Sequence, residues 1–320
     1  MAKRGWSRGQ SCVVLAAVGA VLLGGTACSA DLDRAQNLDT TLAGVEGVDD
    51  AGVRSASTER TNLIEITLDL GLDPTETLAT VRRVDAVARD AGFTTYVLEL
   101  SRTITADDVL VVDDEFAKNR DAKKVVANWI RVLDALLGEV TYEFGTGSEA
   151  IEVVSGGGIA HDIAEASRIG SGDPGTTWRF RSDSSEFVVS GQVARRDVTL
   201  FNRVQRTVSS SVLPVPATNW ELQRRTGHVL LDLEVALDGG TNPERISRER
   251  WATSIRPLAA AAVTSTRYPD SPRWVQLSDV TSAGRDTFAM WGSDGRPVRG
   301  RDRYSRGWDL WWMQLADGVR

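Results

Sequence analysis

Few residues in this chain are suited to acid–base chemistry at neutral pH, because it has only two histidines. His161 stands beside Asp162, and Glu165 follows one helical turn later. A His–Asp–Glu trio is able to transfer protons or to hold a weakly bound metal. The same residues suit a solvated helix start, where acids favour the positive end of the helix dipole. We favour the helix start, and we expect His228, which follows Gly227, at an edge or turn.

Two glycine-rich segments are candidates for phosphate or dinucleotide binding. Residues 145–150 fit the pattern G-x-G-x-x-A, but the strand-like sequence IEVV follows, whereas a dinucleotide site needs a helix there. A hairpin turn is therefore predicted. Residues 155–158, Ser-Gly-Gly-Gly, lie between a predicted strand and a predicted helix, so their amides are able to hold an anion. Without a following Lys or Thr, a simple connector is favoured.

Three runs of acidic residues fall at predicted turns, at 49–50, 107–108 and 113–115. Paired carboxylates do acid–base work in glycosidases, but they need a cleft and a separation of about 5–10 Å. Solvated turns are the default interpretation. The sequence also holds no nucleophile-elbow, zinc-protease, Walker or EF-hand motif. No catalytic residue, cofactor or metal site is therefore predicted.

Cys28 has the most specific surroundings of any residue. Three basic residues within the first eight precede the apolar run 12–23, which is too short to cross a bilayer and is typical of a signal-peptide core. Small residues end this run, and Ala27 stands directly before Cys28. The segment resembles the lipobox of bacterial lipoproteins, with Gly25 where that family usually has leucine.

This resemblance covers residues 1–28 and implies signal cleavage between Ala27 and Cys28, with a diacylglycerol on the cysteine thiol. Two acyl chains give stable anchoring, at about 0.8 kcal/mol per buried CH₂. We therefore expect a palmitate-bearing protein held by lipid on the outer, extracytoplasmic face of the cell membrane. The alternative is simple secretion with Cys28 as a spare thiol.

Composition and charge agree with an exported globular chain. Of 320 residues, 42% are apolar and 25% charged, which excludes a disordered chain or one built around membrane spans. Removal of residues 1–27 takes away three basic groups and no acid, so the net charge falls from −7 to −10. Such a chain is unsuited to nucleic acid and is repelled by anionic lipid, so the anchor itself must hold it. The 33 arginines against 4 lysines are typical of GC-rich, actinobacterial-type genomes.

The elements that position these residues recur along the chain. Leu63–Leu70 alternates apolar and polar residues like a half-buried strand. Asp73, Pro74 and Glu76 then form a helix start with a capping box. The sequences LDLGLDPTE and LEVALDGGTNPE share this strand-to-helix junction, which indicates repeated units.

The predicted fold class is α+β, with three repeated two-layer modules and mostly antiparallel sheets. Each module consists of two strands, a helix and two strands, and a helix leads into the next module. The predicted parts are a signal peptide (1–27), a polar lipidated tether (28–43) and modules at 44–115, 116–193 and 194–320. The element order is similar to that of BON-type envelope domains, a resemblance that carries over no functional residue.

The C-terminal segment combines tryptophans with arginines. Trp308, Trp311, Trp312 and Leu315 share one face of a predicted helix. A speculative anion-binding group stands just before them, made of Arg296, Arg299, Arg301, Arg303 and Arg306. One interpretation places both sets at a membrane interface. We favour the other, in which the tryptophans cover the sheet of the third module and the arginines lie in a solvated loop.

The sequence thus predicts a lipid-anchored protein with a non-catalytic repeat ectodomain, in envelope interaction or organisation. Its expected partners are membrane lipid, through Cys28, and an envelope protein or glycan. Two alternatives stay open: a solute- or glycan-binding lipoprotein, and a hydrolase acting on cell wall or lipid.

Overall fold

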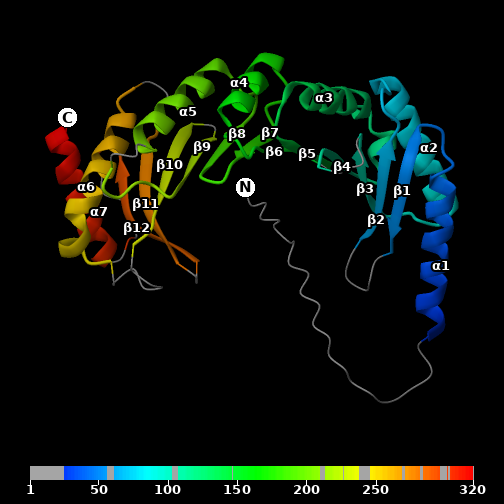
Figure 1. Cartoon of the computed structure of the whole chain (residues 1–320), viewed down its shortest axis with the longest axis horizontal. Coiled ribbons are helices and arrows are strands. Elements are labelled where there is room, and N and C mark those ends of the chain that lie inside the picture. The colour runs from blue at the N-terminus through cyan, green and yellow to red at the C-terminus, as the bar shows by residue number, and fades with distance from the viewer. Residues whose placement is uncertain are drawn as a thin grey trace, which may run out of the picture.

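A computed structural model describes most of the chain from residue 25 onward (Figure 1). The described ranges are 25–55, 61–102, 107–145, 147–209, 213–225, 227–237, 246–268, 271–281, 284–295, 301 and 303–319. For residues 25–31 the description is limited to the backbone.

The chain folds into an arch, with helices along its outer side and a sheet along its inner side (Figure 1). Within the described ranges, one helix is followed by six hairpins, each with a helix after it. The helices are α1 (Gly25–Leu42), α2 (Pro74–Asp90), α3 (Ala122–Ala135), α4 (Ala160–Ile169), α5 (Arg195–Val208), α6 (Arg248–Ser265) and α7 (Arg303–Val319), with a short 3-10 helix η1 (Phe116–Lys118). Each helix from α1 to α7 packs against the next one along the chain.

Twelve strands form one sheet in chain order. They are β1 (Val48–Arg54), β2 (Asn62–Leu68), β3 (Tyr96–Ser101), β4 (Val109–Asp113), β5 (Glu139–Gly145), β6 (Ser148–Val154), β7 (Thr176–Arg181), β8 (Ser185–Ser190), β9 (Asn219–Arg225), β10 (His228–Val235), β11 (Trp274–Thr281) and β12 (Gly284–Gly292). Each hairpin is antiparallel, and successive hairpins meet through a parallel pair, because the helix between them returns the chain to the same end of the sheet. The fold is therefore α+β with a mixed sheet.

The three predicted modules are not confirmed as separate units. The boundary predicted at 115/116 is crossed by the parallel pair β4·β5, and the boundary at 193/194 by the parallel pair β8·β9. Both pairs continue the same sheet, so the repeated unit along the chain is a hairpin followed by one helix. Apolar alternation identifies a strand and its buried face, but it does not show which strand lies at each edge.

The start of α2 shows how local sequence sets an element's bounds. The Asp73 carboxylate accepts hydrogen bonds from the backbone N–H of Thr75 (2.6 Å) and Glu76 (2.9 Å). The Glu76 carboxylate accepts one from the N–H of Asp73 (2.9 Å). The predicted capping box is therefore confirmed, and Pro74 occupies the first turn, where its missing N–H costs nothing.

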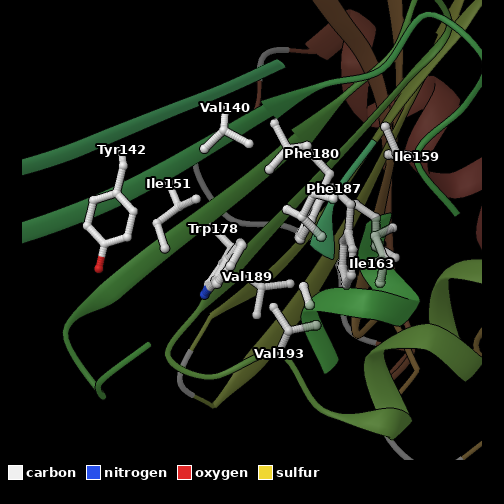
Figure 2. Close-up of a cluster of buried hydrophobic side chains, with 14 of the residues drawn as sticks. Val140, Tyr142, Ile151, Ile159, Ile163, Trp178, Phe180, Phe187, Val189 and Val193 are labelled. Atoms are coloured by element: carbon white, nitrogen blue, oxygen red, sulfur yellow. The ribbon is translucent and has the colours of Figure 1, made fainter. Parts of the chain in front are cut away.

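The core lies between the row of helices and the sheet, and its middle part is shown in Figure 2. Trp178 and Phe180 are fully buried, with parallel rings whose centroids are 5.5 Å apart. Ile163 of α4 covers them together with side chains of neighbouring strands. Gly172 has φ +103°, and a Cβ there would lie 2.9 Å from the indole nitrogen of Trp178. This glycine therefore lets the backbone pass close to the core.

The segment predicted as a tether, residues 28–43, lies almost entirely within α1. Ala35, Leu38 and Leu42 are buried, and the helix packs against β1 and α2. Their spacing of three and four residues places them on one helical face within an otherwise polar segment. The folded part of the chain therefore begins within a few residues of Cys28, with no free linker between residues 32 and 42.

Candidate functional site

The described helices all lie on one side of the sheet, so none of them covers the other side (Figure 1). Side chains alternate along each strand: Ile64 and Ile66 of β2 are buried towards the helices, so Glu65 lies on the other side. We call this side the inner face. Its charged residues include Arg54, Glu65, Glu99, Glu143, Glu152, Arg179, Arg181, Glu186, Glu221, Asp232, Glu234 and Arg285. Acids predominate among them.

The N-terminal part of the inner face contains a groove of about 500 Å³. Its lining includes Asp50, Glu65, Glu99, Asp107 and Glu139, and we call it the acidic groove. Glu65 is paired with Arg54, at 2.6 Å. Among the described residues, no base lies within ion-pair distance of Glu99 or Glu139. The described part of the chain also shows no group of three or more His, Cys, Asp or Glu side chains arranged to hold a metal ion.

Burial raises the pKa of Glu99 above the ordinary value for glutamate, and the negative charge of Glu65 raises it further. The positive charge of Arg54 opposes this effect. At pH values above its raised pKa, Glu99 is ionised in the folded protein. This ionisation requires more free energy in the folded protein than in the unfolded chain. Ionisation of Glu99 therefore destabilises the fold, and this cost disappears as the pH falls and both states become protonated.

We therefore expect Glu99→Gln to raise the melting temperature at pH 7. The gain should shrink as the pH falls through the raised pKa of the folded state towards about 4.3, the ordinary pKa of glutamate, and should vanish below it. Calorimetry at several pH values measures both effects. Glu143→Gln, an exposed change on the same face, is the matched control and should leave the melting temperature unchanged. A lower melting temperature for Glu99→Gln at pH 7 would show that its carboxylate stabilises the fold.

In the middle of the arch, arginines and glutamates alternate across neighbouring strands. Arg181 is paired with Glu152 at 2.8 Å and lies 3.7 Å from Glu186, while Arg179 lies 3.3 Å from Glu186. Burial raises the pKa of Glu186, and the charge of Glu221 on the next strand adds to the effect, against the two arginines. Here the acids of the inner face are partly neutralised.

At the C-terminal end of the inner face, Arg285 forms ion pairs with three acidic residues. Its guanidinium lies 2.7 Å from Asp232, 3.0 Å from Glu234 and 3.5 Å from Glu221. Burial raises the pKa of Asp232, whereas hydrogen bonding by Gln276 and the charge of Arg285 lower it. The acidic groove, at the opposite end, has fewer such counter-charges.

The structure does not join His161 to its two acidic neighbours. Asp162 is buried and accepts hydrogen bonds from the Ser155 hydroxyl and from the backbone N–H of Leu137 (2.8 Å). Glu165 is paired with Arg168, and His161 is exposed at the start of α4. No hydrogen bond or ion pair links His161 to Asp162 or Glu165. Asp162 instead ties the start of α4 to the end of α3 and to the loop after β6.

The predicted positions of the glycine segments agree with the structure. Gly145 at the end of β5 pairs with Ser148 at the start of β6, as expected for a hairpin, and residues 155–158 lie between β6 and α4. The prediction that Asp49 and Asp50 form a turn was wrong, because both lie within β1. Sequence analysis therefore missed the acidic groove. A signal was present in Glu65 and Glu99, which lie on strands separated by one helix and are aligned neighbours in the sheet.

The arginines near the C-terminus do not form one exposed group. Arg296 and Arg299 lie outside the described residues. Arg301 is largely buried, is paired with Asp309 at 3.3 Å and donates to the backbone carbonyl of Thr287 at 3.1 Å. Arg306 donates to the carbonyl of Arg301, whereas Arg303 is exposed. Arg301 therefore holds α7 against β12.

The tryptophans of α7 differ in burial. Trp308 and Trp312 are buried, and their indole N–H groups donate to the carbonyls of Ile246 (3.1 Å) and Ala259 (3.2 Å). Trp311 is half-buried and meets Trp308 edge to face, with centroids 5.3 Å apart. These contacts place the aromatic face of α7 on α6 and β12.

Cys28 lies in the first turns of α1, but its side chain, like residues 1–24, is outside the described residues. None of the helices in the described part of the chain combines the length and apolarity needed to span a bilayer.

Comparison of the chain with protein families, with curated proteins and with solved structures finds no match. The inner face and its acidic groove are therefore interpreted from their own chemistry.

Proposed function

We propose that the protein is a membrane-anchored extracytoplasmic lipoprotein whose ectodomain is not an enzyme and acts in envelope interaction or organisation. The lipobox ending at Cys28 supports the anchor, and its position at the start of α1 supports attachment at the N-terminal end of the arch. At about 1.5 Å per helical residue, the four residues from Cys28 to Leu32 span roughly 6 Å. The arch would thus begin directly at the membrane surface.

The observation that supports the interaction role is the inner face, which extends along all twelve strands and which no helix of the described part of the chain covers. Repeated units that stack side by side create extended concave surfaces, and proteins of this kind use them to bind elongated partners. A long surface of this type suits a protein segment or a glycan chain better than a single small molecule.

The charges of the acidic groove indicate what chemistry the partner has. Burial and the negative charge of Glu65 both disfavour the ionised form of Glu99 and raise its pKa, against the positive charge of Arg54. Groups whose pKa is shifted by burial and by like charge concentrate at functional sites. A cationic partner would remove the repulsion, so we infer that the groove binds a basic segment of an envelope protein.

In-cell photocrosslinking tests this proposal. A photoreactive residue at Glu143, exposed on the inner face beside the groove, is compared with one at Arg131, exposed on α3. We expect a discrete adduct with an envelope protein from position 143 and none from position 131. Equal adducts from both positions, adducts from position 131 alone, or none from either would contradict the proposal.

A solute-binding lipoprotein is the second candidate, and the volume of the acidic groove is the observation that favours it. The groove of about 500 Å³ is within the size range of small-ligand sites, and its carboxylates would select a cationic solute. In that case the Glu143 probe would give no protein adduct, and a solute would copurify with the chain.

A further inference from the structure

A second cavity, of about 560 Å³, lies at the edge of the sheet near its C-terminal end. Its described walls come from the first turns of α5, the facing ends of β9 and β10, residues 266–268 and 271–273 between α6 and β11, and Ser293 after β12. The charged side chains and the imidazole among these described residues are Arg196, Asp197, Arg224, Arg225, His228 and Arg273. Within the described lining, four arginines and a histidine thus surround one carboxylate, in a protein whose net charge is −7.

The one acid of this lining is already engaged in holding the fold. Asp197 is buried, its carboxylate accepts a hydrogen bond from the backbone N–H of Ala194 (2.8 Å), and it lies 2.6 Å from Nε of Arg224. Arg224 also donates to the carbonyl of Gln192, at 3.0 Å. These contacts tie α5 to β9, and the carboxylate of Asp197 also interacts with the charge of the more distant Arg196.

The remaining three arginines have no ion-pair partner among the described residues. Arg196, Arg225 and Arg273 are exposed, and no described carboxylate lies within 4.0 Å of their guanidinium groups. Like charges gathered around one cavity repel each other, and an anion between them would relieve this repulsion. We call Arg196, Arg225 and Arg273 the arginine triad.

The cavity wall opposite β9 is held in place. The Arg203 guanidinium lies over the Tyr268 ring, 4.1 Å from its centroid, and donates to the Ser271 hydroxyl at 3.2 Å. Pro272 is buried next to Ser271. A wall that is already ordered reduces the conformational entropy that is lost on binding a ligand.

We propose that this cavity binds the phosphate group of a phosphorylated molecule through the arginine triad. The planar guanidinium forks of arginine match phosphate oxygens in pairs, and each charged hydrogen bond is stronger than a neutral one. The cavity is several times larger than a phosphate ion, so space beside Tyr268 and Leu200 remains for the rest of the ligand. A free phosphorylated metabolite and a phospholipid headgroup present the same chemistry.

The test uses the purified full chain with two probes, inorganic phosphate and vesicles of phosphatidylglycerol and phosphatidylcholine. Calorimetric titration measures phosphate binding, and sedimentation measures vesicle binding. The variants are Arg196→Ala, Arg225→Ala and Arg273→Ala. Arg195→Ala is the matched control, because Arg195 is the neighbouring exposed arginine on α5 and does not line the cavity.

We expect saturable binding of phosphate, weakened about tenfold or more by each triad variant and by less than about twofold by the control. Unchanged melting temperatures show that the variants are folded. Triad-dependent binding of vesicles without binding of phosphate supports the same site with a lipid headgroup as its ligand. Absence of saturable binding for both probes, or an equal loss in Arg195→Ala and Arg196→Ala, overturns the proposal. Neither result depends on the acidic groove.

Discussion

Replacing Trp312 by alanine is expected to lower the free energy of unfolding by about 3–5 kcal/mol. Its side chain is fully buried between α7 and α6, and its indole N–H donates to the carbonyl of Ala259 at 3.2 Å. The variant loses the apolar contact, leaves a cavity and frees a buried carbonyl. Urea denaturation of the full chain in detergent, followed by tryptophan fluorescence and circular dichroism, measures the change.

Leu310→Ala is the matched control for this experiment. Leu310 lies on the same helix and is 53% exposed, so its loss should change stability by no more than about 0.5 kcal/mol. Trp311→Ala should give an intermediate effect, because Trp311 is half-buried. Unchanged stability in Trp312→Ala, together with weaker binding to liposomes, would show that α7 lies on the membrane instead of on the sheet.

Cys28→Ser is expected to abolish lipid attachment and to release the protein from membranes. A serine hydroxyl cannot form the thioether through which a lipobox cysteine carries its diacylglycerol. Without acyl chains, the mature chain, with net charge −10, has no attraction to anionic headgroups. Wild-type protein should therefore incorporate labelled palmitate and sediment with membranes, whereas the variant should do neither.

Cys12→Ser provides the control, because Cys12 is the other cysteine and lies within the apolar run of the signal segment. This variant should be labelled and retained like the wild type. If Cys28→Ser still incorporates palmitate, the lipid is attached elsewhere and the lipobox assignment is wrong.

Local patterns in the sequence predicted the elements well. The stripe of apolar residues between 120 and 137 corresponds to α3, and the alternation from Leu63 to Leu70 corresponds to β2. Both signals are periodic within one segment, so a single sequence contains them in full. The joining of all hairpins into one sheet was not predicted, because the pairing of β4 with β5 depends on backbone bonds between distant segments.

The two candidate sites were less predictable than the elements. Sequence analysis placed His228 correctly next to a turn, at the start of β10. The sequence does not show that His228 shares a cavity with Arg196 and Arg273, because these two arginines lie on other elements. The acidic groove likewise combines residues from β1, β2, β3 and β5, whose side chains meet only through the register of the sheet.

The central claim is that the acidic groove of a lipid-anchored arch binds a basic partner. The most direct test is the yield of the Glu143 crosslink in cells that carry Glu65→Gln and Glu99→Gln together. Loss of both charges should reduce the yield about tenfold or more, because charge pairs buried at an interface contribute several kcal/mol to binding. A yield equal to that of the wild type, at equal protein level, would contradict the claim.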